Sequence, residues 1–79
     1  MIKSVEKVKF LVLFKSQFEE KKDEIYFETP FKDLPEWSSM QALIIITTFH
    51  EEFNVILHEK ELKTAVTVED LYNLILKKL

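Results

Sequence analysis

Few side chains in this chain of 79 residues could do chemistry, and two adjacent serines are the foremost candidates. Ser38 and Ser39 precede an apolar periodic segment that begins at Met40. A serine hydroxyl at such a boundary can cap the helix. It can equally carry an attached anionic group, because the first backbone N–H groups of a helix lack partners and its dipole is positive there. Ser39 occupies the first helical position, and from the local sequence alone the favoured interpretation is that both serines merely start the helix.

The two histidines favour neither metal binding nor catalysis. His50 and His58 are eight residues apart, the chain has no cysteine, and the carboxylates complete no recognisable metal motif. Ser39 and His50 on one helix would lie about 16 Å apart at 1.5 Å per residue, beyond hydrogen-bond reach. We therefore expect surface histidines, no metal site and no catalytic residue.

Composition also argues against an enzyme or a nucleic-acid binder. The chain has no glycine, which excludes a P-loop and a dinucleotide-binding turn, since both need the close backbone approach that glycine permits. Residues 1–23 hold six Lys against four acids (+2), and residues 24–79 hold five Lys against ten acids (−5). The chain has no arginine, and nucleic-acid binding usually needs a basic face rich in Arg and Lys, so it is disfavoured. A basic partner surface fits the acidic remainder better.

Length and hydropathy predict one domain over residues 1–79. Hydrophobic residues make up 47% of the chain and include seven Phe, enough for a core but leaving little room for an enclosed active site. The longest apolar runs have five residues, whereas a membrane span needs about 20. With no apolar signal segment at the N-terminus, we expect a cytoplasmic protein without a membrane partner.

The first predicted helix runs from a cap at Ser4 to Phe18. Apolar residues recur there at three- and four-residue steps in two stripes: Val5, Val8, Leu11 and Val12, and Phe10, Phe14 and Phe18. Lysines occupy the solvent side. A basic amphipathic helix can bind membranes, but a core helix with a solvated face is the favoured interpretation. A long loop over 19–33 follows, with expected core anchors at Ile25, Tyr26, Phe27 and Phe31.

Three further helices are predicted after the loop. Ser38 caps a helix that runs to about Phe53, Gln41 completes a capping-box spacing, and Asn54 takes the turn. Residues 55–57 cross the core, residues 58–62 form a short third helix, and Thr67 caps the last one. The expected fold is all-α: a small four-helix bundle with a long first loop and a short third helix.

The helix that begins at Ser39 carries more apolar surface than burial requires. On a helical wheel its core face holds Ala42, Ile45, Ile46, Phe49 and Phe53. Met40, Ile44, Thr47 and Glu51 fall on the opposite side, and Leu43 lies at the boundary. Single exposed apolar residues are ordinary, but these five (Met40, Leu43, Ile44, Thr47 and Glu51) form a candidate partner-docking strip.

Four motifs in residues 31–76 together resemble an acyl carrier protein. They are Phe31-Lys32-Asp33-Leu34, Ser38-Ser39-Met40, Glu51-Glu52-Phe53 and Thr67-Val68-Glu69-Asp70-Leu71. That family shows a Phe-x-x-Leu segment, Asp-Ser-Leu at the head of the second helix, a Glu-Glu-x-Phe-like end to it, and a Thr-capped final helix. The motifs occur here in that order, and the spacing from Ser39 to Leu71 needs no gap. Trp37 matches a tryptophan frequent in stand-alone carriers.

The resemblance implies a function and a cofactor. Ser39 would carry 4′-phosphopantetheine, whose thiol would hold acyl intermediates as thioesters. The implied partners are a phosphopantetheinyl transferase and the enzymes that load and process the acyl group. The carrier itself is expected to be a monomer.

The departures from the family pattern concern mainly the partners. Ser38 replaces the usual aspartate, Met40 the leucine, and Pro35 the glycine of the preceding turn. Positions along the second helix that are acidic in many fatty-acid carriers hold Gln41, Ile44 and His50 in this chain. These replacements favour a specialised lipid, polyketide or related pathway over housekeeping fatty-acid synthesis. The alternative is an unmodified helical interaction module that docks through Met40, Leu43 and Ile44.

Overall fold

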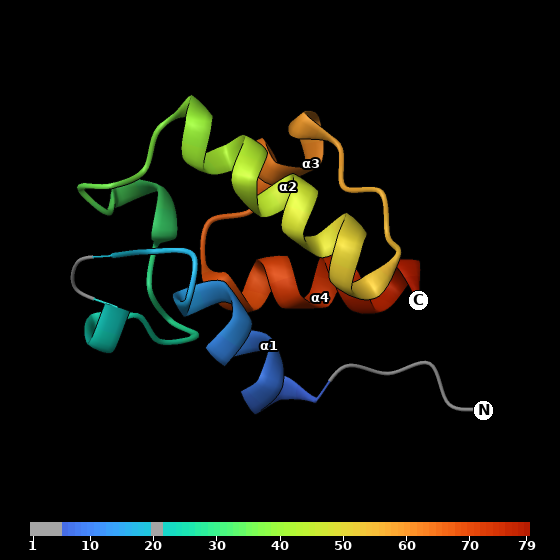
Figure 1. Ribbon diagram of the computed structural model, residues 1–79, viewed down its shortest axis with the longest axis horizontal. Coiled ribbons are helices and arrows are strands. Elements are labelled where there is room, and N and C mark those ends of the chain that lie inside the picture. The colour runs from blue at the N-terminus through green and yellow to red at the C-terminus, as the bar shows by residue number, and fades with distance from the viewer. Residues whose placement is uncertain (1–5, 20–21) are drawn as a thin grey trace.

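The computed structural model describes residues 6–19 and 22–79, and the regular secondary structure within these ranges is all helical. Its elements are α1 (Lys7–Lys15), the 3₁₀ turns η1 (Lys22–Glu24) and η2 (Phe31–Asp33), α2 (Ser39–Phe53), α3 (Glu59–Thr64) and α4 (Val68–Lys78). Figure 1 shows α2 crossing above α4, with the long α1–α2 connection gathered at one end of the molecule. The prediction of a small all-α four-helix bundle is confirmed.

Helix α1 is shorter than predicted and buries one of its two stripes. Phe10, Phe14 and Phe18 are buried, whereas Val8 is 71% exposed and Val12 59% exposed. The helix ends at Lys15 rather than Phe18, because the Ser16 hydroxyl donates to the Leu13 carbonyl and the next backbone bonds tighten to a three-residue step. The predicted cap Ser4 and the apolar Val5 lie outside the described residues.

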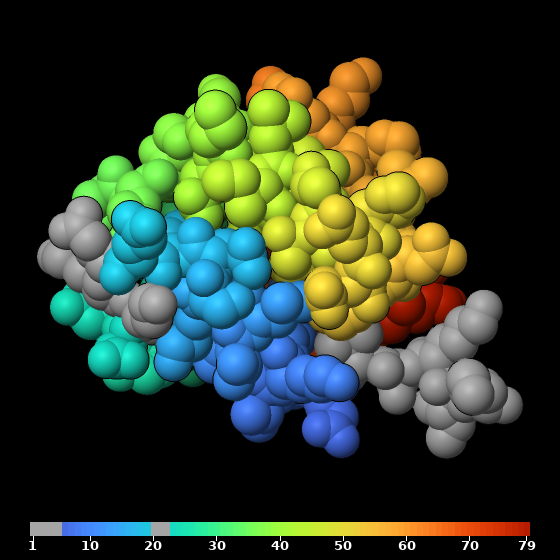
Figure 2. Space-filling model, in the orientation of Figure 1, coloured from blue at the N-terminus to red at the C-terminus, as the bar shows by residue number. Residues whose placement is uncertain are grey.

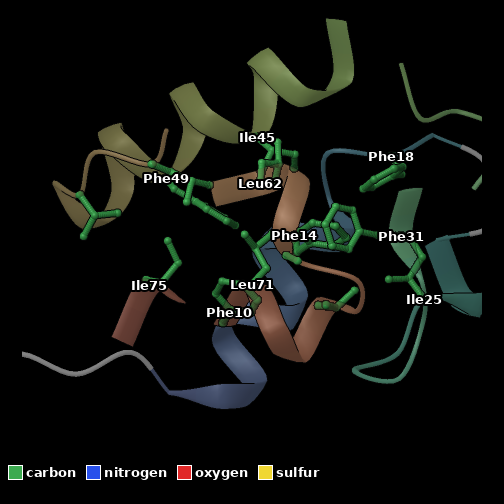
Figure 3. Packing of buried hydrophobic residues seen from close by; sticks show 14 residues of the cluster. Phe10, Phe14, Phe18, Ile25, Phe31, Ile45, Phe49, Leu62, Leu71 and Ile75 are labelled. Carbon is green, nitrogen blue, oxygen red and sulfur yellow. The ribbon is translucent and has the colours of Figure 1, made fainter. Parts of the chain in front are cut away.

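Five phenylalanine rings form the centre of the core (Figure 3). Phe14 is the hub, with its ring centroid 6.4 Å from Phe10, 5.2 Å from Phe18 and 5.7 Å from Phe31. Phe49 of α2 packs 5.2 Å from Phe10. Aliphatic residues from all the later elements complete the cluster: Ile25, Ile45, Val55, Leu57, Leu62, Ala65, Val68, Leu71 and Ile75.

The described part of the long loop caps the start of α4 and packs against the core. The N–H groups of Val68 and Glu69 donate to the carbonyls of Thr29 and Phe27, at 3.1 and 3.0 Å. Two of the four N–H groups that a helix start leaves unpaired are thus satisfied by a segment some forty positions earlier in the sequence. Of the predicted loop anchors, Ile25 and Phe31 are buried and Phe27 is half-buried, but Tyr26 is 57% exposed, which corrects that expectation.

The connection from α2 to α3 alternates in burial as an extended segment does. Asn54 ends α2 with φ 56°, the left-handed conformation that asparagine tolerates better than most residues. Val55 and Leu57 are buried, but Ile56 between them is 64% exposed, so only two of the three predicted core residues enter the core. The short third helix begins one residue later than predicted and ends at Thr64.

We expect Phe14→Ala to lower the free energy of unfolding by about 3–5 kcal/mol, because it removes the ring that all three neighbouring phenylalanines contact. The matched control on the same helix is Val12→Ala, whose exposed side chain should change stability by less than about 0.5 kcal/mol. Urea unfolding followed by circular dichroism measures both. Equal losses in the two variants would contradict this description of the core.

We expect the Asp70 carboxylate to contribute to acid sensitivity. Backbone N–H donors from Thr67, and then from Val66, lower the pKa of Asp70 below its ordinary value. A lowered folded pKa gives a contribution that is complete above the unfolded pKa, about 3.9, and is lost as pH falls through the folded pKa. Stability measured by urea unfolding should therefore fall more steeply below about pH 4 in wild type than in Asp70→Asn. If stability falls equally steeply at low pH in wild type and in Asp70→Asn, the assignment is contradicted.

Candidate functional site

The start of α2 is built as the sequence predicts, apart from one side chain. Ser38 is extended, and its Oγ accepts the N–H of Gln41 at 3.2 Å, so Ser39 is the first helical residue. The Gln41 side chain does not return to Ser38 to complete a capping box. It is buried, and its Nε2 donates to the Gln17 carbonyl at 2.9 Å, because that carbonyl lies just past the end of α1 and has no helical partner.

Ser39 differs from Ser38 in having an unengaged hydroxyl. Ser38 Oγ is occupied by its capping bond, whereas within the described residues Ser39 Oγ forms no hydrogen bond, and the residue is exposed. The backbone N–H groups of Ser39 and Met40 likewise have no acceptor in the described part of the chain. An oxygen-rich anionic group on Ser39 would find donors there and the positive end of a 15-residue helix.

A groove of about 250 Å³ lies beside Ser39, between the start of α2 and the short α3. Its walls come from η2, the Trp37 turn, α2 and α3: Lys32, Trp37, Ser38, Ser39, Ala42, Glu59, Leu62 and Lys63. Trp37, Ala42 and Leu62 make it largely apolar. The Trp37 ring is fixed edge-on against buried Phe31, with centroids 5.0 Å apart and planes at 73°. Ser39 is thus held at the rim of an apolar groove.

Two cations line the same groove, and Lys32 is the more constrained of them. Lys32 Nζ donates to the Lys63 carbonyl at 2.6 Å and to the Leu62 carbonyl at 3.4 Å, which caps the C-terminal end of α3. The Lys63 ammonium instead lies 3.6 Å from the Glu59 carboxylate, and both of these side chains are more than 70% exposed. The groove therefore combines apolar walls with one anchored positive charge.

The candidate docking strip lies at the surface along α2. Met40 is 67% exposed, Leu43 58% and Ile44 37%, and Thr47 and Glu51 are also exposed. Figure 2 shows the yellow-green residues of α2 over a broad part of the face turned to the viewer. The expected core face is buried at Ile45 and Phe49 and only partly buried at Ala42, Ile46 and Phe53.

A second hollow, of about 260 Å³, opens at the other end of α2. It is lined by Ile46, Thr47, His50, Ile56 and Leu57. Thr47 therefore belongs to this hollow, whereas Ser39 lines the first one. Sequence reasoning missed Ile56 here, because a run of three apolar residues was assigned wholly to the core.

The histidines and carboxylates form no metal centre in residues 6–19 and 22–79. His50 and His58 are both exposed, and no group of three or more potential ligands gathers within those ranges. His58 instead precedes α3, where its backbone N–H donates to the Glu61 carboxylate at 2.9 Å. That bond, followed by the Lys78 ammonium, lowers the pKa of Glu61. Across the described segments no helix is long and apolar enough to cross a bilayer.

Lys32 is the groove residue that sequence reasoning did not single out. It lies inside the Phe31–Leu34 motif, where the pattern specifies only the phenylalanine and the leucine. Its role depends on α3 carbonyls thirty positions later, which no local pattern encodes. The signal available in the sequence was limited to a charged residue directly after a core phenylalanine.

Comparison with known proteins does not identify the chain. No model of a known protein family matches it, and no curated protein matches it significantly. The resemblance to acyl carrier proteins therefore rests on the order and spacing of the four sequence motifs.

We expect Ser38→Ala to lower the free energy of unfolding by about 1 kcal/mol, because Gln41 N–H loses its acceptor. Ser38→Asp should keep that bond and add a favourable interaction with the helix dipole, so its stability should equal or exceed that of wild type. Ser39→Ala is the matched control, since its hydroxyl caps nothing. Urea unfolding of the three variants tests the assignment, and a larger loss in Ser39→Ala than in Ser38→Ala would refute it.

Proposed function

We propose that this protein is an acyl carrier protein whose Ser39 hydroxyl carries 4′-phosphopantetheine. The observation that carries the proposal is the position of Ser39: an exposed, unengaged hydroxyl on the first residue of α2, at the rim of an apolar groove. The order of the four motifs supports it, because η2, α2 and α4 lie on the segments that the resemblance assigns to them.

The surroundings of Ser39 fit the group that the proposal attaches. The backbone N–H groups of Ser39 and Met40 can donate to phosphate oxygens, and Lys32 supplies a positive charge in the same groove. When attached, the arm supplies a thiol that holds acyl groups as thioesters, chemistry that no side chain of this cysteine-free chain offers. The protein itself provides the hydroxyl that is modified and the surface that other enzymes recognise.

Attachment requires a partner enzyme. Ser39 Oγ would form a new bond to the β-phosphorus of coenzyme A, adenosine 3′,5′-bisphosphate would leave with the bonding electrons, and the hydroxyl proton would pass to a base of the phosphopantetheinyl transferase. Ser38 is a poorer acceptor of the group, because its oxygen is occupied by the Gln41 N–H.

Partner enzymes that load and process the acyl group would read the outer face of α2. Met40, Leu43, Ile44, Thr47 and Glu51 form that face. It is uncharged from Ser39 through Thr48, and the acidic residues begin at Glu51. The missing acidic positions favour a specialised lipid, polyketide or related pathway, served by a cytoplasmic monomeric carrier.

The second candidate is an unmodified interaction module. The exposure of Met40, Leu43 and Ile44 favours it, because three large apolar side chains on one short stretch of helix suit a protein interface. The two candidates differ in whether Ser39 acquires a covalent group.

We expect purified protein to gain the mass of one phosphopantetheine when treated with coenzyme A, Mg²⁺ and a broad-specificity phosphopantetheinyl transferase. Intact-mass spectrometry measures the gain. Ser39→Ala should show no gain, because the accepting hydroxyl is absent, while the matched Ser38→Ala variant should still be modified. No gain in wild type with several competent transferases, or a gain that persists in Ser39→Ala, would refute the proposal and favour the interaction module.

A further inference from the structure

The end of α3 is held by a lysine from a distant segment. In this six-residue helix the last carbonyls have no partner within the helix. The Glu61 carbonyl accepts the Ala65 N–H and the Thr64 hydroxyl. The next two carbonyls, of Leu62 and Lys63, are taken by Lys32 Nζ. The end of α3 therefore depends on where the Lys32 ammonium is held.

Lys32 also lines the groove that begins at Ser39. Lys32 and Ser39 both line the hollow of about 250 Å³, one from η2 and the other from the start of α2. An ammonium group has three N–H donors, and two of those on Lys32 are used by the α3 carbonyls. The third forms no hydrogen bond within residues 6–19 and 22–79 and is free to bind an added acceptor.

We propose that Lys32 is the side chain that binds the phosphate of the arm on Ser39, and that this contact couples attachment of the arm to the order of α3. The inference rests on the proposed function. The ammonium keeps its bonds to the Leu62 and Lys63 carbonyls and donates its third N–H to a phosphate oxygen. A bond to an anionic oxygen is shorter and about twice as strong as one to a neutral acceptor, so the phosphate also restrains the ammonium against α3.

Lys32 acts here as a positioning residue, and Lys63 is the less suitable cation. Lys63 carries its charge on a well-exposed side chain that already faces Glu59 at 3.6 Å. Exposed pairs of that kind contribute little. Lys32 instead reaches the groove with its ammonium already fixed by two backbone oxygens, so binding the phosphate orders little additional side chain.

The test compares wild type, Lys32→Gln and Lys32→Arg, each before and after modification. Glutamine can still donate to an α3 carbonyl but has no charge, so it separates the two roles of Lys32. Arginine retains both the charge and the donors. Lys60→Met, on the exposed side of α3, is the matched control because it removes a lysine that does not line the groove.

Intact mass first establishes that each protein carries the arm. Thermal unfolding, ³¹P NMR of the phosphodiester and hydrogen exchange at the end of α3 are then measured. In wild type and Lys60→Met, attachment should raise the melting temperature by about 3 °C and slow exchange at the end of α3 about threefold. Lys32→Gln should show neither effect and a displaced ³¹P signal, and Lys32→Arg should recover at least half of each.

The outcomes separate this inference from the proposed function. An equal melting-temperature rise and an equal ³¹P signal in wild type and Lys32→Gln, with the mass gain present in both, would overturn the role of Lys32 and leave the carrier function standing. Absence of the mass gain in every protein would instead refute the carrier function itself.

Discussion

The position of Ser39 depends on a line of aromatic contacts that starts in α1. Phe14 packs edge-on against Phe31, and Phe31 packs edge-on against Trp37, two residues before the serine. Each such pair contributes about 0.5–1.5 kcal/mol beyond the area that it buries. The chain has no disulfide to fix its loops. Ring packing therefore determines where the turn before α2 lies, and with it one wall of the groove beside Ser39.

Polar contacts then set the direction in which α2 leaves that turn. The Ser38 hydroxyl oxygen caps α2 by accepting the Gln41 N–H. The buried side chain of Gln41 then joins the first turn of α2 to the Gln17 carbonyl, just past the end of α1. Gln17 in turn accepts the Thr48 hydroxyl through its side-chain oxygen. Gln17 alone, just past the end of α1, therefore bonds to two positions of α2, Gln41 and Thr48. This leaves the opposite side of α2, from Met40 to Glu51, to face outward.

The two ends of α2 and the start of α4 could be predicted from the sequence because their determinants are local. The caps at Ser38 and Thr67 and the left-handed turn at Asn54 each involve side chains and backbone within a few residues. The errors arose where a distant segment or a competing local bond decided the outcome. Ser16 ended α1 early, and Gln41 bonded to Gln17 in place of completing the capping box at Ser38. At the site, the position of Ser39 at the start of α2 followed from the pattern, whereas the groove and Lys32 needed the placement of α3.

The carbonyls of Phe27 and Thr29 that receive the first N–H groups of α4 have a consequence for how the chain assembles. Thr67 caps the third N–H of this helix locally, but the first two N–H groups gain their protein acceptors only when a loop of about forty residues has closed. Closing a loop of this length carries an entropic cost that grows only slowly with its size. The capping of the last helix therefore depends on where residues 27–29 are placed, and a break in the backbone between η2 and α2 would open this loop and loosen the start of α4.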